Sequence, residues 1–277
     1  MTLGQCLMSA QARIAAVSDS PRLDAELLLG QVLGLSRARI FAQLHDELPP
    51  AQAQHFEALV ARRAAGEPVA YLVGTRGFWT FDLAVTPAVL VPRPETELLV
   101  EWGLELLRGV AQPRIVDLGT GSGALALALA SERADAQVDA TDLSVEALAV
   151  ARANADRLGR SVCFRHGDWF GALGGRRYDL IVSNPPYIAH DDPHLAILRH
   201  EPLAALTDGG DGLGALRAIS AGAARHLADD GWLLVEHGYD QGAAVRALFS
   251  RAGFVDVSTR RDYAGQERAT AGRSTQR

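Results

Sequence analysis

A short apolar strand that runs directly into a glycine-rich loop and then a helix constrains this fold most strongly. The predicted strand covers residues 114–118 and the alanine- and leucine-rich helix covers residues 124–131. The loop between them consists of Gly119, Thr120, Gly121, Ser122 and Gly123. Glycines let the backbone turn sharply and approach a ligand without an intervening Cβ. This unit therefore predicts a nucleotide-bearing cofactor bound at the carboxyl edge of an α/β sheet.

Helical and strand patterns alternate from residue 95 onward, as a doubly wound sheet requires. The strands predicted besides 114–118 are 137–142, 162–166, 178–183, 232–236, 253–257 and 267–271. The predicted helices cover 95–108, 124–131, a segment capped by Ser144 that runs to about 158, and 215–228. The fold class is therefore α/β, a Rossmann-like sheet of about seven strands.

The first 70 or so residues are predicted to be helical. A helix at 22–29 has Pro21 before it and Gly30 after it, and a second helix spans 51–65. The aromatic and β-branched segment 78–85 predicts a strand or a hairpin. We therefore expect a helical domain of residues 1–75, a β-hairpin linker of residues 76–92 and a sheet domain of residues 93–277.

Composition excludes several classes of protein. The 277 residues are 48% hydrophobic, enough for one large or two smaller cores, and the net charge of −6 provides no global attraction to nucleic acid. No apolar stretch approaches the roughly 20 residues that span a bilayer, and the amino terminus lacks a secretory pattern. Two distant cysteines predict neither a disulfide framework nor a metal site. We expect a soluble cytoplasmic protein.

Acidic and aromatic residues at the ends of the next two strands extend the cofactor prediction. Asp142 lies 21 residues after Gly121, where a carboxylate accepts both ribose hydroxyl protons. Its alternative role is to cap the helix after Ser144, but its pairing with the loop favours ribose binding. Asp168 offers a carboxylate to an adenine amino group, and Trp169 offers either an aromatic wall or a core side chain.

The loop alone leaves two cofactors open. Gly119, Gly121 and Ala124 loosely satisfy the dinucleotide fingerprint, whose third position allows alanine. The same loop also fits the Gly-x-Gly-x-Gly pattern of S-adenosylmethionine enzymes, which have no pyrophosphate to bind.

A rigid, acceptor-rich segment decides between them. Asn184, Pro185, Pro186 and Tyr187 follow the strand predicted at 178–183. Proline has a nearly fixed φ and no backbone N–H, so the segment presents oxygen acceptors at fixed positions, which suit a planar NH2 group. A simple Pro-Pro turn is the structural alternative. We call this segment, residues 184–187, the rim. Because hydride transfer has no evident use for such a rim, the combination of glycine loop and rim favours S-adenosylmethionine as the cofactor.

Together these motifs resemble the bacterial release factor glutamine methyltransferases, also called the HemK or PrmC family, nearly from end to end. Further matching segments are 22–29, 66–72, 91–97, 167–170, 182–188, 201–202, 236–239 and 261–263. The resemblance implies N5-methylation, by S-adenosyl-L-methionine, of the glutamine in the Gly-Gly-Gln motif of class-1 peptide chain release factors. It also implies a seven-stranded methyltransferase domain behind a helical domain that docks the substrate protein.

The resemblance also assigns residues by motif position. It implies that the glycine loop, Asp142 and Trp169 hold the cofactor, and that the Asn-Pro-Pro-Tyr rim holds the glutamine, with Asn184 near both. We expect the Asn184 side-chain oxygen and the Pro185 carbonyl each to accept one N–H of the substrate, and Tyr187 to pack against the flat amide. Asp117 contacts the methionine end of the cofactor or serves only the strand end; both roles stay open.

Three alternatives compete with this assignment. A DNA or RNA amino-methyltransferase suits the same rim, but it must grip phosphates, and the chain shows no concentrated basic patch. A non-catalytic binding module would retain the fold without activity. Another glutamine-bearing protein, such as a ribosomal protein, is the third. We expect a protein substrate, no direct nucleic-acid partner and no membrane.

Overall fold

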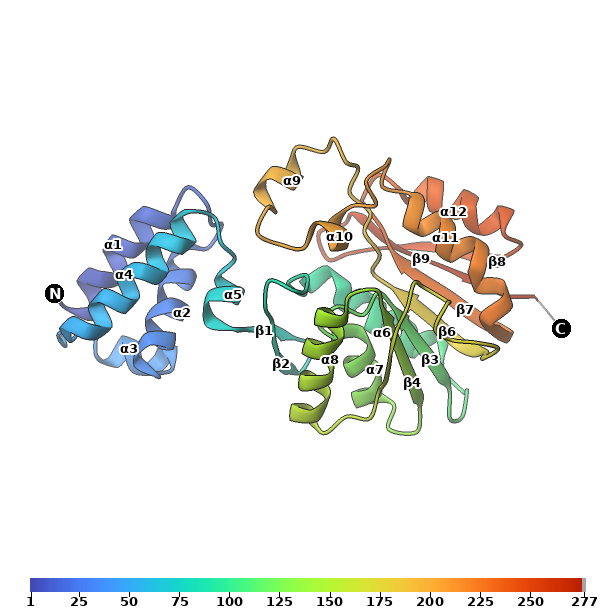
Figure 1. Ribbon diagram of the computed structural model, residues 1–277, viewed down its shortest axis with the longest axis horizontal. Coiled ribbons are helices and arrows are strands. Elements are labelled where there is room, and N and C mark those ends of the chain that lie inside the picture. The colour runs from blue at the N-terminus through green and yellow to red at the C-terminus, as the bar shows by residue number, and fades with distance from the viewer. Residues whose placement is uncertain (276–277) are drawn as a thin grey trace. The chain divides into compact units, whose positions relative to one another are not determined.

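The computed structural model describes residues 1–275, which form two compact units divided between Thr75 and Arg76. The first unit is built of helices, with one isolated β-bridge between Thr2 and Glu47 (Figure 1). Its helices are α1 (Leu3–Ile14), α2 (Pro21–Leu33), α3 (Arg37–Ala42), α4 (Pro50–Ala64) and α5 (Val69–Val73). They enclose a separate apolar core whose fully buried members include Ile14, Leu28, Ile40 and Phe56. The prediction that this part of the chain is helical is confirmed.

The predicted end of α2 at Gly30 was wrong. The helix continues through Gly30 to Leu33 and ends at Gly34, whose φ of +64° is left-handed. Gly30 is instead a point of close approach, because a Cβ there would lie 2.9 Å from the Leu35 carbonyl oxygen. A glycine inside a helix and a glycine that ends one look alike in the sequence, and only the backbone separates them.

The second unit begins within the first strand of a two-stranded hairpin, β1 (Thr75–Phe78) and β2 (Phe81–Ala84). A seven-stranded sheet follows in the order β5-β4-β3-β6-β7-β9-β8. Its strands are β3 (Arg114–Leu118), β4 (Gln137–Asp142), β5 (Cys163–His166), β6 (Tyr178–Ser183), β7 (Leu227–Glu236), β8 (Val255–Arg261) and β9 (Glu267–Arg273). The first five pair in parallel and β9 is antiparallel to both of its neighbours. The prediction of a seven-stranded Rossmann-like fold is confirmed.

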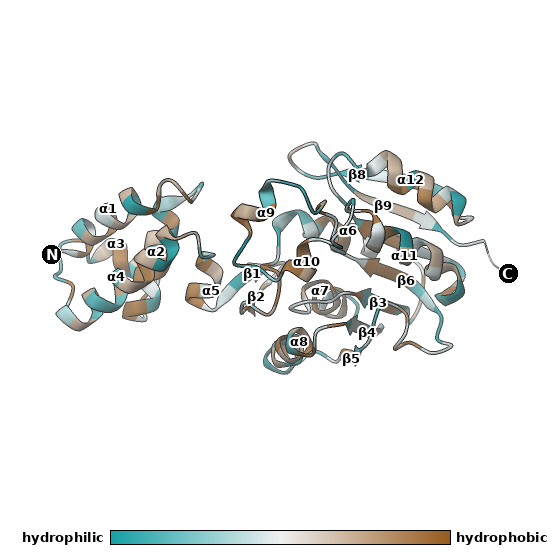
Figure 2. Cartoon of the chain, turned by 45° about the horizontal axis from the view of Figure 1, so that its top comes forward, coloured by the Kyte–Doolittle hydropathy of each residue, from teal (hydrophilic) through white to brown (hydrophobic). Residues whose placement is uncertain are grey.

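Helices cover both faces of this sheet. The covering helices are α6 (Glu97–Leu106), α7 (Ala124–Glu132), α8 (Val145–Leu158), α11 (Gly214–Ala223) and α12 (Gly242–Arg251). The short helices α9 (His194–Ile197) and α10 (Leu203–Leu206) lie in the segment between β6 and α11. Figures 1 and 2 show α7 and α8 on one side of the sheet and α11 and α12 on the other. Leu180 and Val182 of β6 pack with α6 and α7, whereas Ile181 packs with α11 and α12. Successive residues of a strand point to opposite faces, so β6 is buried on both sides and reads as a continuous apolar run.

Several boundaries differ from the predicted ones; the strand predicted at 253–257, for example, is β8 at Val255–Arg261. The helix predicted to start at residue 95 begins as a 3-10 turn, Pro94–Thr96, and becomes α-helical at Glu97. The helix predicted at 215–228 ends at Ala223, and β7 already begins at Leu227. An irregularity in the pairing with β6 and a left-handed Asp230, with φ of +61°, interrupt the apolar pattern there. That interruption hid the first half of the strand.

The order of the strands places the ligand site. The chain leaves β3 toward β4 and β5 on one side, then returns to β6 and β7 on the other. The loops after β3 and β6 therefore diverge, which opens a crevice at the carboxyl ends of these neighbouring strands. Within residues 1–275, no helix is long and apolar enough to cross a bilayer.

Candidate active site

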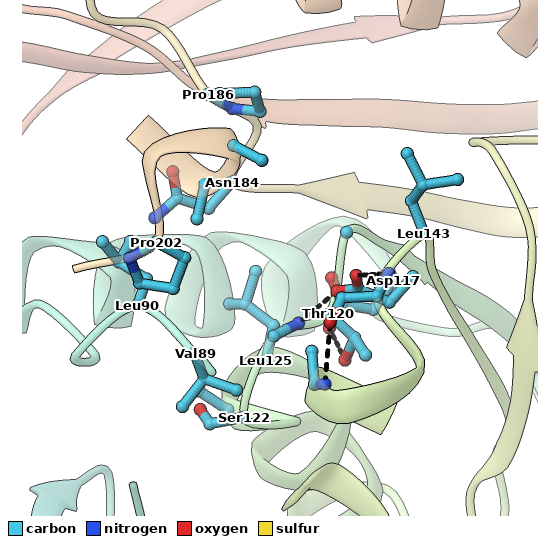
Figure 3. Close-up of a pocket in the computed structure, with 18 of the residues that line it drawn as sticks. Val89, Leu90, Asp117, Thr120, Ser122, Leu125, Leu143, Asn184, Pro186 and Pro202 are labelled. Carbon is cyan, nitrogen blue, oxygen red and sulfur yellow. Dashed lines mark hydrogen bonds between the residues drawn. The ribbon is translucent and has the colours of Figure 1, made fainter. Parts of the chain in front are cut away.

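Two cavities meet at the carboxyl ends of β3 and β6. The larger has a volume of about 380 Å³ and the smaller about 210 Å³. Four residues line both of them: Leu90, Arg93, Asn184 and Ala205. Figure 3 shows Asp117 and Thr120 on one side of the larger cavity, with Leu90, Asn184 and Pro202 on another.

The structure brings most of the predicted site residues together. The larger cavity is lined by Asp117, Gly119, Thr120, Gly121, Ser122, Asp142, Asp168, Trp169, Asn184 and Pro186. The smaller cavity is lined by Asn184, Pro185 and Tyr187. Gly123 lines neither cavity, because it lies beneath the loop, where a Cβ would meet Leu127 at 3.0 Å. Its φ of +87° also requires glycine, so Gly123 shapes the entry to α7.

The glycine loop is fixed to the end of β4. The backbone N–H groups of Gly119 and Thr120 both donate to the Thr141 carbonyl at 2.9 Å. The Gly121 N–H donates to Asp142 Oδ2 at 2.8 Å, and Gly121 has a left-handed φ of +56° with open space where a Cβ would point. A side chain there would be strained and would point into that open space, which suits a backbone that must approach a ligand.

Asp142 supports both the loop and the start of α8. Its Oδ1 accepts from the Ser144 N–H at 2.8 Å, and its Oδ2 accepts from Gly121. The helix cap itself is Ser144, whose hydroxyl oxygen accepts from the Ala147 N–H at 3.0 Å. Each carboxylate oxygen has a further lone pair, and Asp142 lines the larger cavity. The carboxylate therefore retains acceptors for a pair of hydroxyl groups.

Asp117 is a buried acid with one unsatisfied oxygen. Its side chain is 1% exposed, and Oδ2 accepts from the Thr120 hydroxyl at 2.6 Å and from the Ala126 N–H at 3.3 Å. Among the described residues, Oδ1 has no hydrogen-bond partner. Burial raises the pKa of Asp117 from 3.8 to about 7.

The unsatisfied Oδ1 of Asp117 distinguishes between the two candidate cofactors. A buried carboxyl without a partner favours a positively charged group in the adjacent cavity and disfavours an anion. The ammonium of S-adenosylmethionine satisfies that requirement, whereas the pyrophosphate of a dinucleotide would bring negative charge to the same loop. The residues present therefore fit S-adenosylmethionine and argue against the dinucleotide alternative.

Trp169 belongs both to the cavity wall and to the core. Its ring lies 3.4 Å from the position that a Gly119 Cβ would occupy, and it packs against the core cluster beneath α11 and α12. Its backbone has a left-handed φ of +40°, and its carbonyl accepts from the Thr141 hydroxyl at 3.1 Å. The exposed Asp168 precedes it along the same wall. The two roles expected for Trp169 are thus compatible.

Buried polar residues lie behind the rim. Asn184 Nδ2 donates to the Thr96 hydroxyl oxygen at 3.0 Å, and the Thr96 hydroxyl donates to Glu236 Oε2 at 2.7 Å. The Tyr187 hydroxyl donates to Glu236 Oε1 at 3.0 Å. Thr96 and Glu236 are 4% and 1% exposed. Both residues fall in segments that match the family, 91–97 and 236–239, but neither was assigned to the site from the sequence. An acid at the carboxyl end of a buried strand was a visible signal for Glu236.

The segment before α6 forms another wall. The Arg93 guanidinium pairs with Glu201, whose Oε2 also accepts from the Val91 N–H at 3.0 Å. Arg93 and Thr96 line the larger cavity, whereas Glu97 accepts from the Trp79 N–H at 2.8 Å. The segment is therefore partly a cavity wall and partly the start of a helix.

Two family models match this chain. The model described as PrmC N-terminal domain matches residues 5–74, and the model described as Methyltransferase small domain matches residues 95–211. Together they cover the helical unit and the part of the sheet unit that carries the glycine loop and the rim.

Similar proteins agree with these matches. The release factor glutamine methyltransferase of Xylella fastidiosa (strain Temecula1) is 54% identical over 264 residues, covering 94% of this chain and 95% of that protein. The Escherichia coli K12 protein of the same name is 48% identical, covering 92% and 93%. The solved 16S rRNA N2 G1207 methyltransferase of T. thermophilus, in complex with AdoMet and guanosine, shares the fold at 21% identity and a TM-score of 0.53, covering 72% and 49%. By its similarity to the first two proteins, the chain belongs to the family of release factor glutamine methyltransferases.

Proposed function

We propose that this protein transfers a methyl group from S-adenosylmethionine to the side-chain nitrogen of the glutamine in the Gly-Gly-Gln motif of class-1 release factors. The position of Asn184 carries this proposal, because it lines both cavities. Its Nδ2 is bound to Thr96, and within residues 1–275 its Oδ1 accepts no hydrogen bond. An amide oxygen at the junction of the two cavities could accept a hydrogen bond from the substrate nitrogen in one cavity while that nitrogen approaches the cofactor in the other.

The larger cavity is proposed to hold the cofactor. Its volume of about 380 Å³ lies within the range of about 300–1,000 Å³ that small-molecule sites occupy. Asp142 would accept the ribose hydroxyls, Trp169 and Asp168 would contact the adenine, and Asp117 would face the ammonium. When bound, S-adenosylmethionine supplies an electrophilic methyl group, so the chemistry that remains to the protein is placement.

The smaller cavity is proposed to hold the glutamine side chain. Asn184 Oδ1 and the Pro185 carbonyl would each accept one N–H, which fixes the nitrogen and frees its lone pair to face the methyl group. Holding two reactants in line contributes on the order of 7–11 kcal/mol. Methylation makes the amide nitrogen far more acidic, so its proton leaves afterwards to water and requires no strong base.

The affinity for S-adenosylmethionine should depend on pH through Asp117. Its raised pKa of about 7 means that the free protein binds a proton there at lower pH, and a cationic ligand must release it. We expect affinity to weaken below pH 7 by up to about tenfold per pH unit. It should weaken again above about pH 8, where the ligand's own amine loses its proton.

Calorimetric titration across this range, repeated with Asp117→Asn, measures the effect. The variant should bind more weakly at neutral pH and lose the acidic limb of the profile. An acidic limb that is unchanged in Asp117→Asn would assign the proton to another group.

A labelling experiment tests the proposed reaction. The protein is incubated with methyl-labelled S-adenosylmethionine and, separately, with an intact class-1 release factor, a short Gly-Gly-Gln peptide and DNA. We expect label on the glutamine of the intact factor, mapped by mass spectrometry, and none when that glutamine is replaced by alanine. Label on DNA alone would instead establish an amino-methyltransferase of bases.

The same experiment tests the proposed division of labour along the chain. We propose that residues 1–75 dock the substrate protein and that residues 93–277 catalyse the methyl transfer. Residues 76–92 would form the linker between these two parts. This predicts stronger labelling of the intact factor than of the peptide. A cytoplasmic location also belongs to the proposal, because release factors act in translation. Equal labelling of peptide and factor would mean that residues 1–75 do not contribute to docking.

A further inference from the structure

A buried carboxylate controls the hydrogen bonds behind the rim. Glu236 lies at the carboxyl end of β7 and accepts one hydroxyl on each oxygen, from Thr96 at 2.7 Å and from Tyr187 at 3.0 Å. Thr96 in turn accepts from Asn184 Nδ2 at 3.0 Å. We call Glu236, Thr96 and Asn184 the Glu236 relay. Its outer end is the amide at the junction of the two cavities.

The relay has a defined direction. A carboxylate only accepts hydrogen bonds, so the single hydroxyl proton of Thr96 must point to Glu236. The Thr96 oxygen then remains as an acceptor, and only the NH2 end of Asn184 can satisfy it. The amide oxygen of Asn184 is thereby directed away from Thr96, toward whatever enters the site.

Without this direction the amide would have two nearly isosteric orientations. The oxygen and NH2 ends of an asparagine side chain differ little in shape and are distinguished by their hydrogen-bond partners. The flipped orientation would present a donor to the substrate NH2 group, which also donates. Such a pair forms no hydrogen bond and leaves buried donors unsatisfied.

The hydrogen-bond geometry of Glu236 supports its acceptor role, because each of its two oxygens meets a hydroxyl donor. The pKa of Glu236 is raised overall, because burial outweighs the opposing effects of the Thr96 and Tyr187 hydroxyl groups and of the positive charge of Arg268. Arg268 is itself held by Asp262, with Nε 3.1 Å from Oδ2. As a carboxylate, Glu236 accepts from both hydroxyl groups, and the positive charge of Arg268 favours this ionised form.

We propose that Glu236 and Thr96 are positioning residues that orient the Asn184 amide, so that the site selects a side chain able to donate N–H bonds. This inference rests on the proposed function, because it assumes that a primary amide is the acceptor of the methyl group. It assigns a role to two residues that contact each other across 140 positions of sequence. Tyr187, on the second carboxylate oxygen, is held in place by the same acid.

The test compares Thr96→Val, which keeps the shape but loses the hydroxyl, with Thr96→Ser, which keeps it. Turnover on a class-1 release factor and the dissociation constant of S-adenosylmethionine are measured for both. We expect Thr96→Val to lose roughly ten- to a hundredfold in kcat, as for loss of a hydrogen bond to a charged group. Thr96→Ser should recover most of that loss, and cofactor affinity should change much less than kcat in both.

Glu236→Gln is the second variant. It preserves the shape of the side chain, and it tests the relay independently if the Thr96→Val protein does not fold. Its NH2 end can donate to Thr96 and reverse the relay, so kcat should again fall while cofactor binding persists. Equal losses in Thr96→Val and Thr96→Ser, or wild-type turnover in Thr96→Val and Glu236→Gln, would overturn the relay. A parallel loss of cofactor affinity would assign Thr96 to the cofactor cavity instead. If the wild-type protein itself fails to label a release factor, the proposed function fails first.

Discussion

Replacing Asn184 with alanine should nearly abolish methyl transfer while leaving the affinity for S-adenosylmethionine largely intact. The substitution removes the amide that lines both cavities, and with it one of the two acceptors proposed to hold the substrate nitrogen. Misplacement of a reacting group by about 1 Å can cost on the order of a hundredfold in rate, and loss of the acceptor should cost at least that. Single-turnover labelling and calorimetric titration measure the two effects separately.

His190→Ala provides a control on the same segment. His190 is exposed and lies six residues beyond Asn184, and its backbone N–H donates to the Gly210 carbonyl, a bond that the substitution retains. Both turnover and affinity should remain at their wild-type values in this variant. If Asn184→Ala also turns over normally, the rim is not the substrate site and the proposed mechanism is wrong.

Asp142→Ala should weaken S-adenosylmethionine binding by about 1.5–3 kcal/mol, or roughly ten- to 150-fold in dissociation constant. The substitution removes the proposed ribose acceptor and also frees the Gly121 N–H, which holds the loop in place. Both effects act on the cofactor and neither touches the rim. Calorimetric titration reports the affinity, and chemical denaturation reports the free energy of unfolding.

Ser144→Ala separates ribose binding from helix capping. It removes the hydroxyl that caps α8 through Ala147, which should cost about 1 kcal/mol of stability, but it leaves the Asp142 carboxylate in the cavity. Cofactor affinity should therefore be nearly unchanged. Equal weakening in Ser144→Ala and Asp142→Ala would mean that Asp142 acts only through the start of the helix.

The parts of the fold that were predicted correctly are those with local signals. The predicted bounds of β4 and β6 agree with the structure, because an apolar or β-branched run with turn residues at its ends identifies a buried strand. The errors occur where a residue that usually ends a helix or strand lies inside one. Gly30 permits close packing inside α2, and the irregularity near Asp230 breaks the apolar pattern of β7.

The site residues likewise fall into those that a local sequence signal reveals and those that it does not. The glycine loop and the rim are continuous in sequence, so their residue types reveal them. The partners of Glu236 and Glu201 are distant in sequence: Thr96 is 140 positions from Glu236, and Val91 is 110 positions from Glu201. Only the folded sheet brings them together, and no local pattern encodes such a pair.

The place of β9 has a consequence for how the protein is made. Each of the strands β4 to β7 pairs with a strand that has already been synthesised, so this part of the sheet grows as the chain emerges. The outer edge of β7 cannot close in the same way, since its neighbour β9 follows β8 in the chain and must enter between the two. An unpaired edge is a template for association with other chains. We therefore expect the nascent protein to be most prone to aggregation in the interval between synthesis of β7 and of β9, and to depend most on chaperones then.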